Sequence, residues 1–178
     1  MSYPSGKLEE LDRNELTSQP RLPAISYQFR QGANPNSPDT AGAWPSPTAE
    51  LLFCSAFTDA RRGAAADDLH VDLAHVNEIR QPVFSLTLGL LTLVSLGILP
   101  TYVEEDVVLR ARVEYQGKFA GEYLYRDRVH TWVEVFLIPW SFVHDPVNVE
   151  RSTFENMVLH LLRDLRKDLP QVVSAARP

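Results

Sequence analysis

The sequence has few residues of the kinds that build covalent or metal chemistry. Its 178 residues include a single cysteine, Cys54, so an internal disulfide is excluded. The five histidines are scattered along the chain and show no zinc-ligand spacing on one element. A Ser-His-Asp signature and a phosphate-binding glycine loop are also missing. We therefore expect a non-enzymatic protein without a metal or other cofactor.

A surplus of positive charge is missing as well. Lysine and arginine number 17 against 23 aspartates and glutamates, which gives a formal net charge of −6. A general nucleic-acid-binding protein needs an excess of basic side chains to neutralise phosphates, so the balance argues against that class. With 44% hydrophobic and 22% charged residues, the composition is that of one globular domain with a sizeable core.

The N-terminal segment lacks the basic stretch followed by an apolar stretch that marks a signal peptide. Its polar, proline-containing composition predicts a flexible tether over residues 1–23. A single α+β domain is expected over 24–170 and a C-terminal tail over 171–178. One hypothesis is that Met1 stands where a targeting segment was removed.

Alternation of apolar and polar residues predicts strands over 24–30, 69–73, 107–115 and 118–126, and the second could continue to Ile79. A further strand is expected over 129–138, which is apolar on both faces, as in a central strand or one covered on both sides. Gln116-Gly117 predicts a tight hairpin turn between the third and fourth of these. Trp44, in a long loop rich in Gly, Pro, Asn and Ser, is expected to anchor that loop.

Capping residues predict two amphipathic helices. Ser46-Pro47 starts a helix that is expected to run to about Arg62. Ser152–Glu155 has the pattern of a capping box, and the last helix is expected to begin there or a turn earlier, and to end at Pro170. The fold class that follows is a two-layer α+β sandwich. Two amphipathic helices would pack on one face of a mostly antiparallel sheet of about four to five strands.

Three groups of charged residues are interpreted as solvent-exposed. Glu104–Asp106 lacks the alternating ligands and the glycine of a calcium loop, and it is expected to form a turn. Arg126–Arg128 is expected to form a second turn, whose charges could meet anionic headgroups or a partner. His160 and Asp164, four residues apart on the last predicted helix, are expected to be a solvated pair.

The unusual stretch is VFSLTLGLLTLVSLGILP, from Val83 to Pro100, which has no charged residue. As a transmembrane helix it is at the short limit, and it would put the strands on either side of it across a bilayer from each other. As a core segment it would be a buried helix or a strand pair. As a surface segment its leucines and glycines suit contact with a membrane or a partner.

Three stretches carry a resemblance when they are taken together: SLTLGLLTLVSLGILPTY, GEYLYRDRVHTWVEVFLIPWSF and ENMVLHLLRDL. An apolar run, a Tyr-rich hairpin strand, a Trp-containing strand and a last helix in this order resemble a group of small, poorly characterised bacterial envelope lipoproteins. The element order is also similar to that of the lipopolysaccharide-assembly lipoprotein. The resemblance implies a lipid anchor on an N-terminal cysteine that this chain lacks, and an outer-membrane location facing the periplasm. If Met1 is the natural start, a cytoplasmic location is expected instead.

The apolar run and the resemblance lead to a functional hypothesis. We expect a binding or scaffolding subunit of a membrane-associated assembly, whose partner is an envelope protein or membrane lipid. The residues expected to make this contact are Leu88, Leu90, Leu91, Leu93, Leu96 and Trp140. The alternative is a soluble carrier of a lipid or another apolar small ligand, in which the apolar run and the aromatic strands line a cavity.

Overall fold

The computed structural model describes residues 2–4, 8–32, 42–63, 68–80, 101–133 and 146–176. Within them, six strands form one sheet in the order β1-β6-β5-β4-β2-β3. The strands are β1 (Ser2–Pro4), β2 (Ile25–Gly32), β3 (Ala60–Arg62), β4 (Leu69–Arg80), β5 (Thr101–Tyr115) and β6 (Lys118–Val133). The helices are α1 (Arg13–Thr17), α2 (Pro47–Ser55) and α5 (Pro146–Ala176).

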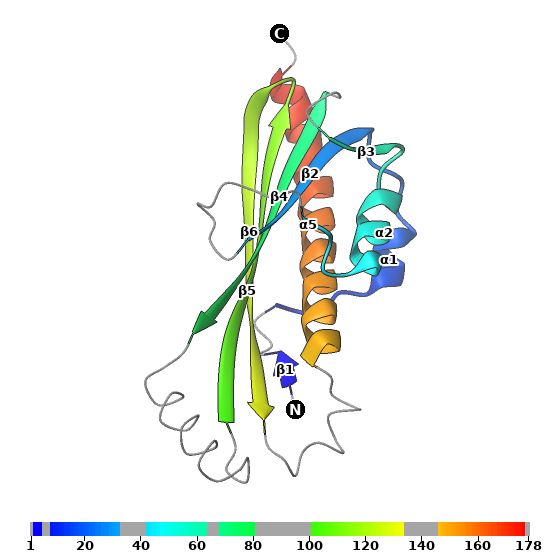
Figure 1. Ribbon diagram of the computed structural model, residues 1–178. Helices are drawn as coiled ribbons and strands as arrows, with labels where there is room; N and C mark the ends of the chain where they lie inside the picture. The colour runs from blue at the N-terminus through cyan, green and yellow to red at the C-terminus, as the bar shows by residue number, and fades with distance from the viewer. Residues whose placement is uncertain are drawn as a thin grey trace.

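The helices form the second layer. Figure 1 shows α5 running along the length of the sheet, with α1 and α2 beside it. Helix α5 contacts β5 and β6, and α2 and α1 pack against α5. Strand β2 pairs in parallel with β3 and β4, whereas the pairs that join β1, β6, β5 and β4 are antiparallel. The predicted two-layer α+β sandwich with a mostly antiparallel sheet is confirmed.

The core lies between the sheet and α5. Alternate residues of each long strand point to the helices, as the period of two requires. The core side chains from the sheet include Ile25, Tyr27, Phe29, Leu69, Val71, Leu73, Val107, Leu109, Ala111 and Val113. Helix α5 supplies Phe154, Met157, Val158, Leu161, Leu162, Leu165 and Leu169. Trp44 anchors its loop as predicted, with its ring stacked on Phe29 at a centroid distance of 4.7 Å.

Helix α2 starts as predicted but ends early. The Ser46 hydroxyl caps its first turn. The helix stops at Ser55 instead of continuing to Arg62, because the following backbone bonds to the segment around β2. The Thr58 N–H donates to the Leu22 carbonyl at 2.8 Å, for example. Residues 60–62 therefore form the edge strand β3, parallel to β2.

Two predicted boundaries near the C-terminus are wrong. Strand β6 runs unbroken through Arg126–Arg128, where a turn was expected. Helix α5 begins at Pro146, a residue suited to the first helical turn, which agrees with the alternative start a turn before Ser152. Ser152–Glu155 therefore lies inside the helix and is no capping box. The Ser152 hydroxyl donates to the carbonyl of Val149, one turn earlier. Pro170 also lies within α5, which continues to Ala176.

The segment predicted to be a tether packs on the domain where the structure describes it. Strand β1 pairs with β6, and α1 lies against α5. The Leu11 N–H donates to Asn156 Oδ1 at 3.1 Å, and Asn156 Nδ2 donates to the Glu9 carbonyl at 3.0 Å. Leu16 and Leu22 are buried. These few apolar residues and the polar groups of α5 hold the N-terminal segment on the domain, although the average composition of the segment is polar.

Two tyrosines join β6 to α5. Tyr125 Oη donates to Asp164 Oδ2 at 2.6 Å, and Tyr123 Oη donates to Asp168 Oδ2 at 2.9 Å. Burial and the neighbouring carboxylates raise the pKa of both phenols, so both hydroxyls remain donors at neutral pH. These bonds fix the position of the helix over the sheet.

Tyr125→Phe is expected to lower the free energy of unfolding by about 1–2 kcal/mol, because the Asp164 carboxylate loses a charge-assisted hydrogen bond. Urea denaturation at pH 7 measures the change. Tyr115→Phe is the matched control, since within the described residues the Tyr115 hydroxyl makes no hydrogen bond. Equal effects of the two substitutions would contradict the role of the Tyr125 bond.

Candidate functional site

The contact residues predicted from the sequence all lie outside the described residues. This holds for the run from Val83 to Pro100 and for Leu88, Leu90, Leu91, Leu93, Leu96 and Trp140. None of the helices that the structure describes has the length and apolar character needed to span a membrane. The candidate site is therefore built from other residues.

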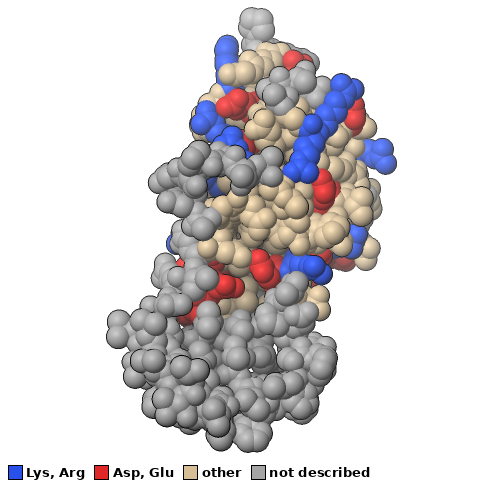
Figure 2. Space-filling view, viewed as in Figure 1, with Lys and Arg blue, Asp and Glu red and all other residues tan. Residues whose placement is uncertain are grey.

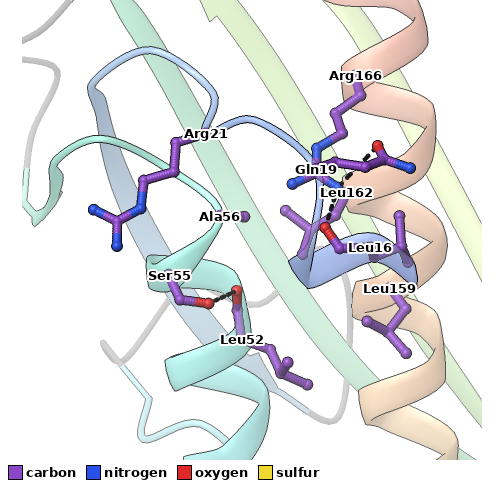
Figure 3. Close-up of a pocket in the computed structure, with 9 residues that line it drawn as sticks. All are labelled: Leu16, Gln19, Arg21, Leu52, Ser55, Ala56, Leu159, Leu162 and Arg166. Atoms are coloured by element: carbon purple, nitrogen blue, oxygen red, sulfur yellow. Dashed lines mark hydrogen bonds between the residues drawn. The ribbon is translucent and has the colours of Figure 1, made fainter. Parts of the chain in front are cut away.

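A pocket opens between α1, α2 and α5, on the side of the helices away from the main core (Figure 3). Its volume is about 230 Å³. Three leucines from the three helices, Leu16, Leu52 and Leu159, form a buried cluster separate from the main core. The pocket is lined by these leucines and by Gln19, Arg21, Ser55, Ala56, Leu162 and Arg166. Its wall is therefore mixed, with leucine side chains on one part and the polar groups of Gln19, Ser55 and two arginines on the other.

Arg166 holds the C-terminal end of α1 against α5. Its Nη1 donates to the Leu16 carbonyl at 2.7 Å and to Gln19 Oε1 at 3.2 Å. Its Nε is buried and has no acceptor within the described residues. Burial lowers the pKa of this guanidinium, which nevertheless stays charged at neutral pH. Figure 3 shows the Arg166 side chain entering from α5 and Arg21 on the opposite side of the pocket.

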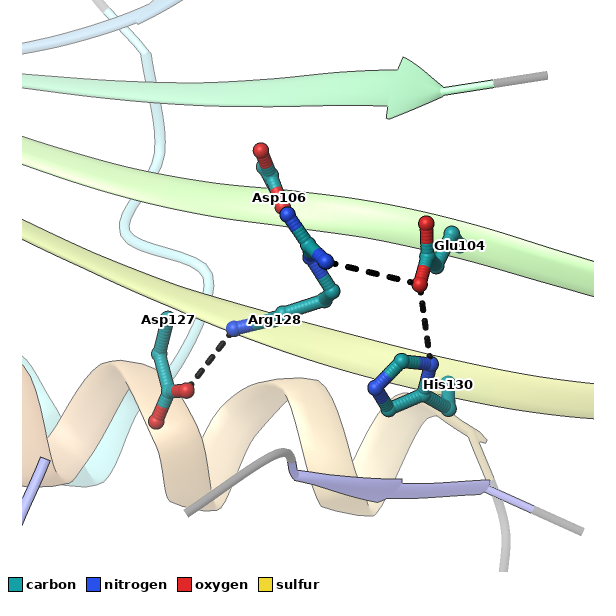
Figure 4. Close-up of polar contacts among 5 residues, drawn as sticks. All are labelled: Glu104, Asp106, Asp127, Arg128 and His130. Atoms are coloured by element: carbon teal, nitrogen blue, oxygen red, sulfur yellow. Dashed lines mark hydrogen bonds and ion pairs between the residues drawn. The ribbon is translucent and has the colours of Figure 1, made fainter. Parts of the chain in front are cut away.

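A second polar group lies across β5 and β6 (Figure 4). Arg128 Nε donates to Asp106 Oδ1 at 2.8 Å, and Arg128 Nη1 lies 3.5 Å from Glu104 Oε1. His130 Nδ1 lies 3.5 Å from the same Glu104 oxygen. Asp106 is only 1% exposed. The predictions of two solvated turns at 104–106 and 126–128 are thus wrong, because the opposite charges neutralise each other across paired strands.

A β-bulge sets this pairing. Tyr115 pairs with Lys118 across the Gln116–Gly117 turn, both residues of which have the positive φ that such turns need. The register then shifts between Val113 and Glu114, which leaves Ala120 without an opposite residue. As a result Asp106 stands opposite Arg128. The strand register thus brings the opposite charges together.

Arg128→Gln is expected to lower the free energy of unfolding by about 2–3 kcal/mol, since buried Asp106 loses a charged donor. Adding Asp106→Asn should restore part of this loss, because the amide carries no charge. Urea denaturation of the wild type, both single variants and the double variant measures the coupling, and purely additive effects would contradict the pairing. Arg112→Gln, in an exposed pair with Glu114, serves as a control with an expected change of about 0.5 kcal/mol or less.

His75 lies at the interface of β4 and α5 and is 1% exposed. Its ring meets Phe154 edge to face at a centroid distance of 4.9 Å. Neither ring nitrogen has a hydrogen-bond partner within the described residues. Burial lowers the pKa of His75 to about 4, while the charge of Glu150 acts in the opposite direction. His75 is therefore neutral at pH 7.

This lowered pKa makes stability depend on pH. The unfolded chain takes up a proton at His75 near pH 6.5, and the folded chain does so only near pH 4. Stability is therefore complete above about pH 6.5 and decreases as the pH falls toward 4. Between pH 7 and pH 5 the expected loss is about 2 kcal/mol. Urea denaturation at both pH values measures it.

His75→Leu should remove this part of the pH dependence, because leucine cannot take up a proton. His70→Gln is the control, since His70 lies on the opposite face of β4 and contacts Ser26 Oγ at 3.0 Å. A His75→Leu variant that loses as much stability on acidification as the wild type would contradict the assignment.

His160 is buried, whereas the sequence predicts a solvated side chain. It is 4% exposed, with Nε2 2.8 Å from the Glu9 carbonyl and Nδ1 3.0 Å from Arg163 Nη2. Asp164 pairs with Tyr125 as described above. Within the described part of the chain, no group of three or more His, Cys, Asp or Glu side chains is arranged to hold a metal ion.

Comparisons with known proteins identify a structural neighbour of the chain but no family to which it belongs. No family model matches the chain, and no curated protein matches it. The chain is similar to a crystal structure of a Xanthomonas campestris protein assigned to the DUF330 family, with 8% sequence identity and a TM-score of 0.40 over 94% of each chain. This structural neighbour is a bacterial protein of an uncharacterised family. A similarity of this degree is no evidence of a shared function.

Proposed function

We propose that this chain is a non-enzymatic binding or scaffolding subunit of a membrane-associated assembly in the bacterial envelope. One observation carries the proposal: the space between the sheet and α5 is filled by its own side chains. Phe29, Leu73, Leu109, Met157 and Leu161 are each at most 2% exposed. Binding would therefore take place on the surface of the domain.

The same observation weighs against a carrier that encloses a lipid between its layers. Sites for small molecules usually have volumes of about 300–1,000 Å³ and bury most of the ligand. The pocket at α1, α2 and α5 has about 230 Å³ and lies on the outer side of the helices. Its wall has both apolar and polar parts, which keeps a carrier of small amphipathic ligands as the second candidate.

The surface of the helix layer supports docking of a partner. Figure 2 shows a largely uncharged area in the middle of this view, with charged side chains of both signs around it. Leu51 of α2 is 68% exposed and adds an apolar side chain to the surface of the helix layer. An uncharged centre with a polar rim is the pattern of many protein interfaces.

The proposed location is the outer membrane, facing the periplasm, with a lipid anchor on a cysteine in place of Met1. This part of the proposal is supported by the sequence resemblance alone. The intact mass of the native protein from membrane and soluble fractions of its host tests it. An acylated cysteine just before Ser2 would support the anchor, and an unmodified soluble chain starting at Met1 would contradict it.

The run from Val83 to Pro100 is proposed as the contact with membrane or partner. Leu90→Asp combined with Leu93→Asp should reduce the share of chain that sediments with host membranes by about tenfold or more. Two leucines at a contact contribute about 1.5–3 kcal/mol each. The experiment uses chain expressed without an acylated cysteine, so that sedimentation measures the contact itself.

Leu124→Asp is the matched control for this experiment, because Leu124 in β6 is 63% exposed. The double variant is expected to unfold at the same temperature as the wild type. Loss of the folded state would assign the run to the core and refute the contact. A wild-type chain that stays in the soluble fraction would refute it as well.

A further inference from the structure

We propose that two copies of this chain join through the free edge of β6, in an antiparallel pairing centred on Leu124. The two sheets would then form one continuous sheet, with both helix layers on the same side of it. This interface goes beyond the proposed docking function, which uses the apolar run and the helix layer and does not require it.

Most of one edge of β6 has no partner strand in the described part of the chain. Strand β5 pairs along the whole length of the other edge. On the edge in question β1 pairs only with residues 129–131, and Figure 1 shows β1 beside the end of β6. Such an edge presents a row of N–H and C=O groups to which another strand can be added. Because the β-bulge at Ala120 bends the strand, the regular free edge runs from Ala120 to Arg128.

The side chains along this free edge are arranged symmetrically. The two tyrosines that bond to α5 alternate with Glu122, Leu124 and Arg126, which therefore point to the opposite face of the sheet. All three are exposed, and Leu124 is 63% exposed. Leu124 lies in the middle of the free edge, and a negative and a positive side chain stand at equal distances on either side of it.

A second copy turned about a two-fold axis through Leu124 matches these charges. Leu124 would lie opposite Leu124 of the second copy, and Glu122 of each copy would lie opposite Arg126 of the other. Opposite charges in directly opposed positions favour strand pairing, and like charges oppose it. Glu122 also pairs with Arg110 of its own chain, so its carboxylate would lie between two guanidinium groups.

Neighbouring registers lose this match. A pairing centred on Tyr123 would place Glu122 opposite Leu124, so both intermolecular charge pairs would be lost. A pairing centred on Tyr125 would carry the second copy into the stretch of the edge that β1 occupies. The free edge therefore selects one register and selects a second copy as its occupant, whereas an edge with charges of one sign would repel a copy of itself.

Sedimentation velocity of the full chain tests the proposal with two charge reversals. Arg126→Glu places pairs of carboxylates opposite each other, and Glu122→Arg places pairs of guanidiniums opposite each other. The two-fold axis repeats each repulsion, so each variant should raise the dissociation constant of the dimer by about tenfold or more. Arg61→Glu is the control, since this exposed residue lies on β3 at the far edge of the sheet, and it should leave the constant unchanged.

An equimolar mixture of the two β6 variants separates the interface from any effect on folding. In a mixed dimer the two carboxylates of one chain lie opposite the two guanidiniums of the other. Mixed dimers should therefore form about as tightly as wild-type dimers, although each variant alone is a monomer at the same concentration. A chain damaged in its folding could not be rescued in this way. A mixture that stays monomeric would overturn the proposal.

A cysteine cross-link locates the two-fold axis. Leu124→Cys in a Cys54→Ala background should give a covalent dimer with a short bismaleimide, because residues opposite each other in a strand pair lie close together. Phe119→Cys in the same background is the matched control, since Phe119 is 59% exposed on the same strand but lies five residues from the axis. Equal cross-linking of the two variants would overturn the proposal, as would a wild-type chain that is monomeric at every submillimolar concentration.

The result is separable from the test of the proposed function. Leu124→Asp is expected to be monomeric, because it places two carboxylates at the axis, and yet to sediment with membranes like the wild type. The Leu90→Asp and Leu93→Asp double variant is expected to dimerise like the wild type. Each proposal can therefore fail while the other stands.

Discussion

The structure depends on the need to cover one apolar sheet face with the long helix α5, to which the shorter α2 adds Ala49 and Phe53. Strands β4, β5 and β6 are long, and their inward side chains are buried against α5. One helix can cover such a sheet only if its direction over the strands is fixed. The apolar contacts hold the helix close without directing it, since hydrophobic attraction has no preferred orientation. Direction comes from the hydrogen bonds of Tyr123 and Tyr125 to Asp168 and Asp164. The N-terminal segment then bonds to the opposite side of α5 and completes the layer.

Much of this fold can be read from the sequence. Alternation of apolar residues located β2, β4 and the inner part of β5, and Gln116-Gly117 located the hairpin turn. The errors have different causes. A run of charged residues predicts solvent exposure, although Asp106 and Arg128 neutralise each other across a strand pair. That contact is distant in sequence and outweighs the local pattern. Ser152–Glu155 also fits a helix start, but the helix begins a turn earlier at Pro146.

The pocket could not be predicted for the same reason. Its wall takes Leu16 from a segment that reads as a polar tether, Leu52 from a helix flank and Leu159 from the edge of the apolar stripe of α5. None of these is unusual in its own segment. Arg166 reads as one exposed base among several on the last helix, and only the packing of α1 shows that its Nε is enclosed. The contact residues that the sequence predicts, in the apolar run and at Trp140, lie outside the described residues.

The bulge at Ala120 has a consequence for how this hairpin can vary among related chains. Without it, counting back from the Tyr115–Lys118 pair would place Asp106 opposite Asp127, and the two faces of β6 would be exchanged from that point on. Tyr123 and Tyr125 would then point away from α5, and Arg126 and Arg128 would point toward it. Changes of length at the hairpin tip can thus be accepted only when both strands gain or lose a residue together. Related chains should therefore gain or lose residues in the two strands together, with single insertions confined to positions outside the paired strands.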